Sequence, residues 1–529
     1  MEKNNEADNM KKKKKKILHI GSVEWQENIH VPDNISWYDV RPDEIHTIPI
    51  TKFVEEKRGK KIINKEVPEV YDVVILSDYF VTGDLTYIEE TVNAYAVVCQ
   101  YGFQHAPELT AFFKKKMPQP LHMDSPQQVV DIIHKNFFNG QYGSKLPISS
   151  IDISPNFKGN MHYEGSAYLS LTHQFGQDLS PICFWKYNVM LDKNVAMEIW
   201  LEYMCEHTCE IELHVQLIAM GGNEVIKEWT LHQEDMQNPT IFDEKDGGYL
   251  SFSLWVKGEG TIQIGALHHR FSNLTYGQFI LGGQRYSDEK RQEFIYYFNP
   301  GNLKPPLNIY FSGFRPAEGF EGYWMLKSLG HPFLLFGDPR LEGGAFYMGS
   351  PEFEQKILSV IQECLTYLNF SNKDMILSGL SMGTFGALYY GSQCSPYAII
   401  IGKPLVNVGS IAGVAQKLRP NEFHTSFDVL KLHTGGISQE HIKQLDERFW
   451  THFSSSTFQN TMIATSYMKH DDYDPSAYYN MIERVGHQSI KIYGNGWIGR
   501  HNDNSAAITN WFFTQYKEII KRDFGGTFE

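Results

Sequence analysis

The feature that most constrains the fold is a serine at a glycine-rich corner, Gly379-Leu-Ser-Met-Gly383. The apolar residues 375–377 before it predict a buried strand, and the small and apolar residues 384–390 after it predict a helix. A G-x-S-x-G motif between a strand and a helix is typical of a strained turn that projects the serine Oγ away from the backbone. Crowding at such a turn explains the glycines at both ends of the motif. We therefore expect Ser381 to be a nucleophile at the edge of an α/β sheet.

A serine hydroxyl is a weak nucleophile and needs a base. In folds with this motif, the acid and then the histidine follow the serine along the chain. His501 lies in a glycine-rich loop, after the apolar residues 490–493 and before residues 504–520, whose spacing predicts a helix. This position predicts that His501 is the base.

The acid is expected after the penultimate strand, which we predict at residues 461–464. Three aspartates compete there: Asp471, Asp472 and Asp474. The acid would accept a hydrogen bond from the imidazole and stabilise the imidazolium. We favour Asp471 and keep Asp472 as the alternative, because the sequence alone does not separate them. Asp474 directly precedes a proline and is more typical of a turn.

An oxyanion hole requires two backbone N–H donors. One is expected from Met382, directly after the nucleophile, and the other from the loop that follows an early strand of the same domain. That loop is Ser312-Gly-Phe-Arg315, which follows the apolar residues 307–311. The expected second donor is therefore Phe314 or Gly313.

Other residues near these motifs are less specific. Arg315 and Glu318 either line the pocket or form a surface ion pair. Cys205 and Cys209 have the spacing of a metal ligand pair but lack a second pair, so we expect no metal site. The sequence has no P-loop and no dinucleotide fingerprint, and we expect no bound cofactor.

The length allows two to four domains, and the first is expected at residues 1–150. Its short apolar runs and helical spacing predict an α/β domain with a parallel, Rossmann-like sheet. Three strands and one helix are expected at residues 17–20, 73–76, 95–98 and 126–137.

Residues 151–296 alternate polar and apolar side chains and predict a β-sandwich. Gly221-Gly222 and Gly258-Glu-Gly260 are interpreted as turns between its strands. Sandwiches of this kind often bind carbohydrate, and four residues could stack on or hydrogen-bond a sugar ring: Trp200, Trp255, His268 and His269. Alternating aromatic residues also fill sandwich cores, which is the simpler interpretation.

Residues 297–529 carry six apolar runs, most of them separated by helical patterns. This region predicts a doubly wound α/β domain of the α/β-hydrolase type. In such a domain the catalytic loops lie at the carboxyl ends of the strands.

Composition excludes several classes of protein. The formal net charge of −14 argues against a nucleic-acid-binding protein. Six cysteines in 529 residues make no disulfide framework and fit a reducing cytosol. No apolar stretch reaches the roughly 20 residues of a membrane span, so we expect a cytoplasmic protein. The lysine run at residues 11–16 is interpreted as a solvated tail, with contact to an anionic inner membrane leaflet as the alternative.

Several motifs together resemble a known family, the hydrolase-like second component of the Asp complex in the accessory Sec system of Gram-positive bacteria. They are the corner GLSMGTFGALYYG, the acid loop MKHDDYDP, the late histidine in GWIGRHND and the loop YFSGFR, within the same three-region layout. The resemblance covers nearly the whole chain. It implies that Ser381 is the nucleophile, His501 the base and Asp471 or Asp472 the acid.

The resemblance also implies a cellular role. The family works in the cytoplasm with two sister Asp proteins, the accessory Sec ATPase and the accessory translocon, and serves the export of serine-rich-repeat glycoprotein adhesins. Its members resemble serine-triad O-acetyltransferases that modify N-acetylglucosamine on the adhesin; the acetyl donor stays unidentified. Two alternatives remain open: a non-catalytic scaffold of the secretion complex, and a stand-alone carbohydrate esterase.

Overall fold

The computed structural model describes residues 14–58, 61–78, 84–103, 106–138, 140–418, 423–456, 458–486 and 488–528. The chain forms two compact units. Unit 1 runs to Gly140 and includes a returning segment, Asn273–Gly282; unit 2 comprises Gln141–Ser272 and Gly283–Glu529. The expectation of a mixed α/β protein with several sheets is confirmed. Among the described residues, no helix combines the length and the hydropathy needed to cross a membrane.

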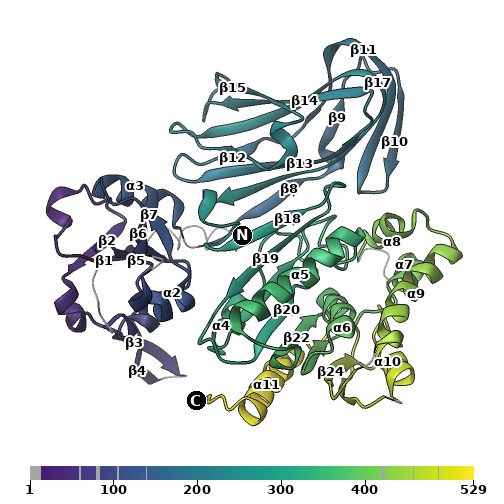
Figure 1. The fold of residues 1–529 in the computed structure, drawn as a ribbon. Coiled ribbons are helices and arrows are strands. Elements are labelled where there is room, and N and C mark those ends of the chain that lie inside the picture. Colours follow the sequence, from purple (N-terminus) through teal and green to yellow (C-terminus); the bar gives the residue numbers. More distant parts are fainter. Residues whose placement is uncertain are drawn as a thin grey trace. The chain divides into compact units, whose positions relative to one another are not determined.

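Unit 1 is built on a parallel sheet with the strand order β2-β1-β5-β6-β7 (Figure 1). Its strands are β1 (Lys15–Ile20), β2 (Ile35–Val40), β5 (Val73–Leu76), β6 (Val97–Gln100) and β7 (Gln119–Leu121); its helices are α2 (Thr110–Lys116) and α3 (Pro126–Asn136), and β3 (Thr51–Arg58) pairs with β4 (Lys61–Pro68) in a separate hairpin. The predicted parallel sheet is confirmed. Strand β6 begins two residues later than predicted, because Tyr95 has a positive φ of 65°, which an extended strand excludes.

The lysine run lies partly in this sheet. Its first three residues, 11–13, are outside the described part of the chain. Lys15 and Lys16 begin β1, so their interpretation as a solvated tail is wrong. Lys15 Nζ donates to the carbonyl oxygens of Ile133 and His134 in the last turn of α3, where helix carbonyls need partners. Burial lowers the pKa of Lys15 to about 8.

The returning segment completes unit 1. Asn273 Nδ2 donates to the carbonyl oxygen of Asn136 at 2.7 Å, and the ring of Tyr276 lies 4.9 Å from that of Phe137. Phe279 is fully buried. Unit 1 therefore needs residues from two distant stretches of the chain, which the sequence patterns did not indicate.

Ten strands of unit 2 pair antiparallel into one continuous sheet around one apolar core, and Figure 1 shows this sheet folded over into two layers. They are β8 (Gly143–Leu146), β9 (Ile151–Ile153), β10 (Asn160–Glu164), β11 (Tyr168–Trp185), β12 (Val189–Leu191), β13 (Ala196–Cys205), β14 (Cys209–Ile218), β15 (Val225–His232), β16 (Thr240–Phe242) and β17 (Gly248–Ser272). We call this part the β-sandwich. Strand β17 pairs with β14 along its first half and with β13 along its second.

The two predicted glycine turns have different outcomes. Gly221-Gly222 lies between β14 and β15, as expected. Gly258-Glu-Gly260 is not a turn between strands but a bend inside β17. The φ angles of Gly258 and Gly260 are 96° and 131°, which lets the strand bend and continue into the other layer.

The second sheet of unit 2 has eight strands in the order β18-β19-β21-β20-β22-β23-β24-β25. They are β18 (Gly283–Ser287), β19 (Glu293–Asn299), β20 (Leu307–Phe311), β21 (Phe333–Gly337), β22 (Met375–Leu380), β23 (Ala398–Gly402), β24 (Met462–Met468) and β25 (Lys491–Trp497). Strands β20 to β25 are parallel, and β18 and β19 form an antiparallel edge.

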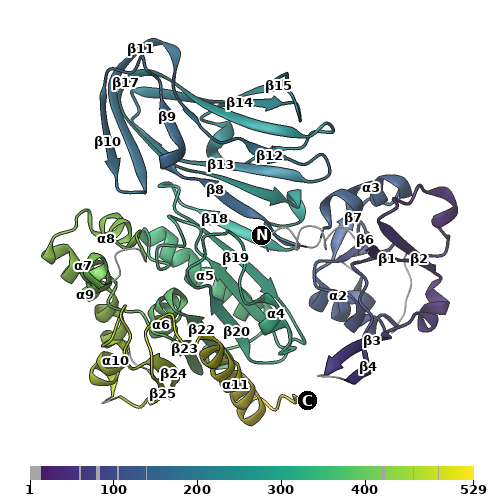
Figure 2. The same cartoon turned by 180° about the vertical axis from the view of Figure 1, so that it is seen from behind.

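Helices cover both faces of this sheet (Figure 2). Alternate residues of each strand face opposite sides of the sheet and so meet different helices. The helices are α4 (Tyr323–Lys327), α5 (Pro351–Leu368), α6 (Met382–Cys394), α7 (Val408–Leu418), α8 (Ser426–Thr434), α9 (Gln439–Ser455), α10 (Ala477–Val485) and α11 (Ser505–Asp523). In β20, Ile309 and Phe311 join the core formed with α5 and α6, whereas Tyr310 packs against Phe512 of α11. The loops that follow the carboxyl ends of the parallel strands can therefore form a site between the two helical layers.

The strand pairing differs at two places from the domain boundaries predicted from the sequence. Strand β8, inside the range predicted for the first domain, pairs with β17 of the β-sandwich. Strands β18 and β19, which fall almost wholly inside the range predicted for the sandwich, join the eight-stranded sheet. The three-domain division itself stays a prediction.

Candidate active site

The serine corner has the strained geometry that its sequence implies. Ser381 lies between β22 and α6 with φ 52° and ψ −121°, a conformation that is rare for a non-glycine residue. A Cβ on Gly379 would lie 2.2 Å from the carbonyl oxygen of Gly383, and a Cβ on Gly383 would lie 2.0 Å from that of Phe311. Neither contact is possible, so the corner requires glycine at both positions.

The structure brings Ser381, His501 and Asp471 together in one hydrogen-bonded chain. Ser381 Oγ lies 2.8 Å from His501 Nε2, and His501 Nδ1 lies 2.9 Å from Asp471 Oδ2. His501 follows β25 and is only 3% exposed, and Asp471 follows β24. A carboxylate on one ring nitrogen leaves the other free to accept a proton from the serine.

The three competing aspartates have three different sets of partners. Asp471 Oδ1 accepts hydrogen bonds from the amides of Tyr473 and Asp474, which fixes its carboxylate under the imidazole. Asp472 does not contact the ring but accepts from the His501 amide and from Arg500. Burial favours the neutral form of Asp472, but these hydrogen bonds hold its pKa below the ordinary value.

The sequence indicates Asp474 as a turn residue, but in the structure its carboxylate binds residues that are distant in the sequence. It is buried, and its carboxylate accepts hydrogen bonds from the amides of Val406 and Asn407 and from the Asn407 side chain. Burial raises its pKa in spite of these bonds. Asp474 thus ties the acid loop to the loop that follows β23.

The backbone amides near Ser381 differ in availability. Met382 is the first residue of α6, so its amide has no partner within the helix and lies at the positive end of the helix dipole. The Gly313 amide donates to Glu321 Oε2 at 2.9 Å and is therefore occupied. Phe314, the other candidate, lines the cavity beside Ser381.

The serine and histidine open onto a cavity of about 270 Å³. Its lining is mainly apolar and aromatic: Phe314, Phe346, Ser381, Met382, Leu405, Phe423, Tyr473, His501 and Asn502. The ring of Tyr473 lies 4.4 Å from the His501 ring. An apolar pocket with a few convergent polar groups is typical of a site for a small organic substrate.

Sequence reasoning missed most of this lining. Phe346 follows β21, Leu405 follows β23 and Phe423 lies shortly before α8, and no motif marks them. The signal for the first two was their place after a predicted strand of a parallel sheet. Lys403 was missed as well: burial lowers its pKa although Asp471 opposes this, and its Nζ donates to Ser505 Oγ at 3.0 Å.

Neither alternative for Arg315 and Glu318 is correct. Glu318 is buried and pairs with Arg270 and His268 of the β-sandwich. Arg315 donates instead to the carbonyl oxygen of Phe320. The partners of Glu318 are about 50 residues away in the sequence, so a local pattern could not identify them.

The sugar-binding interpretation of the sandwich residues is wrong for three of the four. Trp200, His268 and His269 are buried, so they cannot meet a ligand. Trp255 is partly exposed, and its ring stacks on that of His214 at 4.6 Å. The simpler interpretation, that these residues fill the interior, holds for the buried three.

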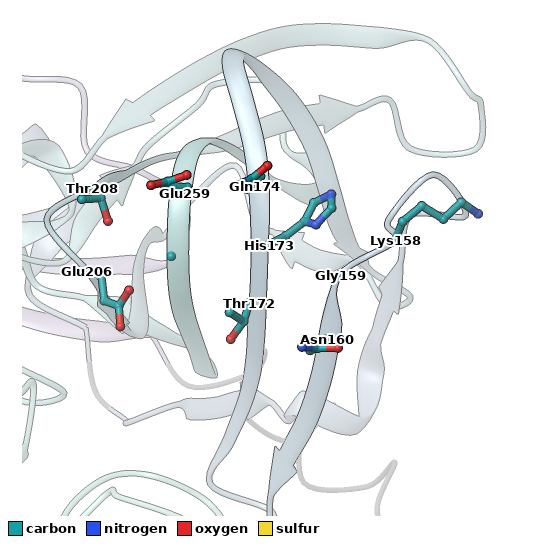
Figure 3. Close-up of a pocket in the computed structure, with 10 residues that line it drawn as sticks. Lys158, Gly159, Asn160, Thr172, His173, Gln174, Glu206, Thr208 and Glu259 are labelled. Atoms are coloured by element: carbon teal, nitrogen blue, oxygen red, sulfur yellow. The ribbon is translucent and has the colours of Figure 1, made fainter.

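A polar hollow of about 580 Å³ lies on the β-sandwich, but its side chains do not converge (Figure 3). Lys158 points away from the other residues, and the Glu206 carboxylate is bound to the Thr261 amide. The described residues contain no group of three or more His, Cys, Asp or Glu side chains that could hold a metal ion. We assign no ligand to this hollow.

Unit 1 contains a second chain of the same three residue types. His19 Nε2 lies 2.8 Å from Ser77 Oγ, and His19 Nδ1 lies 2.6 Å from Asp39 Oδ1, at the carboxyl ends of β1, β5 and β2. The Ser77 hydroxyl lies under Gly21, where a Cβ would be only 2.2 Å away. Asp39 also accepts the amides of Trp25 and Gln26, so this set holds loops together.

The fold and the site of unit 2 define a class of protein: mixed α/β proteins with a serine–histidine–aspartate chain at the carboxyl edge of a mainly parallel sheet. The model of the family of second Asp proteins, described as the accessory Sec system GspB-transporter, matches residues 15–526. The chain belongs to this family.

Known relatives agree over almost the full length. The second Asp protein of the accessory Sec system of Streptococcus gordonii is 39% identical over 97% of this chain and 99% of its own. Its counterpart in Staphylococcus aureus is 42% identical over 84% of this chain and 85% of its own. A chain of the Glycosylation Associate Protein (Gap123) complex from Streptococcus agalactiae is 37% identical, with a TM-score of 0.88 over 97% of this chain and 99% of its own.

Proposed function

We propose that this protein is a serine-dependent O-acetyltransferase that acetylates N-acetylglucosamine on serine-rich-repeat glycoprotein adhesins and supports their export. The observation that carries the enzymatic part is the Ser381–His501–Asp471 chain at the mouth of an aromatic cavity. The family membership supports the export part, because the family is described as a transporter of the accessory Sec system.

In the proposed reaction, Ser381 Oγ attacks the carbonyl carbon of an acetyl ester or thioester while His501 Nε2 takes the serine proton. Asp471 holds the imidazole in the tautomer that can accept this proton and stabilises the imidazolium. The developing oxyanion is stabilised by the Met382 amide and by a second amide, for which Phe314 is favoured because that of Gly313 is occupied. His501 then returns the proton to the leaving group.

The acetyl-serine is resolved by a sugar hydroxyl, which His501 deprotonates as it attacks the acetyl carbon. Attack by water instead would make the same site an esterase. The cavity of about 270 Å³ is large enough for an acetyl group beside Ser381, and a glycan longer than one or two sugars would extend to the surface. The acetyl donor is not identified by any residue of the site.

The proposed partners are two sister Asp proteins, the accessory Sec ATPase and translocon, and the glycosylated adhesin. The match to a chain of the three-protein Gap123 complex supports the sister proteins. We place the protein in the cytoplasm, with peripheral contact to the inner face of the membrane where export begins.

The proposal is tested by replacing Ser381 with alanine and measuring adhesin glycan acetylation by mass spectrometry together with adhesin export. We expect acetylation to be lost. Export that continues would show two separable roles for the protein. Unchanged acetylation would exclude the enzymatic role and leave a scaffold.

A further inference from the structure

A cluster of buried charges connects the β-sandwich to the loop beside Ser381. Glu318 lies in this loop, residues 312–322, and its side chain is only 1% exposed. Its Oε1 lies 2.5 Å from His268 Nδ1, and its Oε2 accepts a hydrogen bond from Arg270 Nε at 2.5 Å. Both partners belong to β17 and are completely buried.

Arg270 and His268 each contact a second carboxylate besides that of Glu318. Arg270 donates two hydrogen bonds to Glu293 of β19, at 2.8 and 2.6 Å, and His268 Nε2 lies 2.8 Å from Glu202 Oε1. Burial acts against a charged imidazole, but the carboxylates of Glu318 and Glu202 raise the pKa of His268 above its ordinary value. A buried ionic set of this kind tolerates little displacement, because any shift leaves a charge without its partner.

The same part of the loop is held at two further points. Gln141 forms a pair of hydrogen bonds with the backbone of Phe320, accepting from its N–H and donating to its C=O, both at 2.7 Å. The Glu318 amide donates to the carbonyl oxygen of Gly143 at 2.9 Å. Residues 318–320 are therefore fixed by side chains and backbone of the sandwich half of unit 2.

The other end of the loop lies beside the nucleophile. A Cβ on Gly313 would be 3.1 Å from the carbonyl oxygen of Leu380, the residue before Ser381. The two ends of the loop are linked, since Glu321 accepts the Gly313 amide and Arg315 donates to the Phe320 carbonyl. Fixing residues 318–320 therefore also fixes residues 313–315.

We propose that His268 and Arg270 are positioning residues for the acyl transfer: by holding Glu318 they fix the loop that places the Phe314 amide against the developing oxyanion. The effect on the reaction rate rests on the proposed function, whereas the effect on the position of residues 312–322 does not. On this view the β-sandwich is a structural part of the catalytic site and not an appended sugar-binding module.

The test uses the full chain with Glu318→Gln, which keeps the size of the side chain and removes its charge. Gln141→Ala is the second variant, because it loosens the same loop without touching the buried ions. The matched control is Glu354→Gln, which removes a carboxylate paired with Arg448 at 2.6 Å in the same unit, away from the loop.

Two measurements are made on variants with a native unfolding temperature. For p-nitrophenyl acetate we expect kcat to fall about 10- to 100-fold in both loop variants with little change in KM, because a misplaced donor acts on the transition state. Hydrogen exchange of residues 312–322 is expected to become faster in the same two variants and to stay unchanged in Glu354→Gln.

Native kcat in Glu318→Gln would overturn the positioning role of His268 and Arg270, whether or not the loop exchanges faster and whatever the result for Gln141→Ala. Faster exchange in the control to the same extent would overturn the loop assignment. If the wild-type protein does not hydrolyse the ester, the proposed function has failed at this step. Unchanged hydrogen exchange of residues 312–322 in both loop variants would then also reject the loop assignment.

Discussion

Each unit of this protein contains a serine–histidine–aspartate chain at the carboxyl end of a parallel sheet. The distance from the serine Oγ to the histidine Nε2 is 2.8 Å in both. The distance from Nδ1 to the carboxylate is 2.9 Å in unit 2 and 2.6 Å in unit 1. The two sets are Ser381, His501 and Asp471 in unit 2, and Ser77, His19 and Asp39 in unit 1.

The surroundings separate the two sets. Ser381 lies on a strained corner, opens onto a cavity and is followed by the amide that begins α6. Ser77 Oγ lies against Gly21, and two nearby amides are already engaged: that of Gln26 donates to Asp39 and that of Ser22 donates to Asp78. A hydrogen-bonded triad is therefore a weak sign of catalysis by itself; access and unoccupied donors are the stronger signs.

The sharpest test of this comparison replaces each serine with alanine. We expect Ser381→Ala to lower the hydrolysis of p-nitrophenyl acetate by at least about 10⁴-fold, because the nucleophile is lost. Ser77→Ala should leave the rate within about twofold. A fluorophosphonate probe followed by peptide mass spectrometry should label Ser381 alone; a label on Ser77 would contradict the comparison.

The two aspartates should separate activity from stability. Asp471→Asn is expected to lower kcat about 10³- to 10⁴-fold, because the imidazole loses its orienting charge. Asp39→Asn should leave kcat unchanged but cost about 1.5–3 kcal/mol of unit 1 stability, since its charged hydrogen bonds hold two loops. Kinetics and chemical denaturation measure the two effects; a slower Asp39→Asn enzyme with native stability would reject this division.

Substitution of Gly383, beside the unit 2 set, should lower activity, whereas substitution of Gly21, beside the unit 1 set, should lower stability. In Gly383→Ala the added Cβ would collide with the Phe311 carbonyl, so α6 must move and carry the Met382 amide with it. We expect kcat to fall by more than about 100-fold. In Gly21→Ala the Cβ would collide with Ser77 Oγ, which should cost about 1–3 kcal/mol of stability with no change in kcat. Loss of activity in Gly21→Ala would link the two sets and break the comparison.

The smallest expected effect concerns pH and Lys15 of unit 1. Its pKa is about 8 in the folded protein against 10.5 as the ordinary value. Between these values the unfolded chain holds a proton that the folded chain has lost, so stability rises with pH across this window. Relative to Lys15→Met, the wild-type protein should gain about 1–2 kcal/mol between pH 7.5 and 10. A constant difference in unfolding free energy would show that Lys15 is not buried in solution.

The sequence was a good guide to local features and a poor one to long-range contacts. The corner at Ser381 and the placement of His501 were predictable, because motif, strand and helix are adjacent in the chain. The preference for Asp471 rested on position alone, and only the structure shows which aspartate contacts the imidazole. The buried partners of Glu318 and the aromatic lining of the cavity come from distant segments, so no local pattern encodes them.

The segment that returns to unit 1 delays the folding of this unit during synthesis on the ribosome. When residue 140 leaves the ribosome, the unit still lacks Tyr276 and Phe279, and residues 141–282 must emerge before it can close. At about 5–20 residues per second this interval lasts on the order of ten seconds. During that time the apolar surface around Phe137 stays uncovered in the nascent chain, so chaperones have a defined period in which to act.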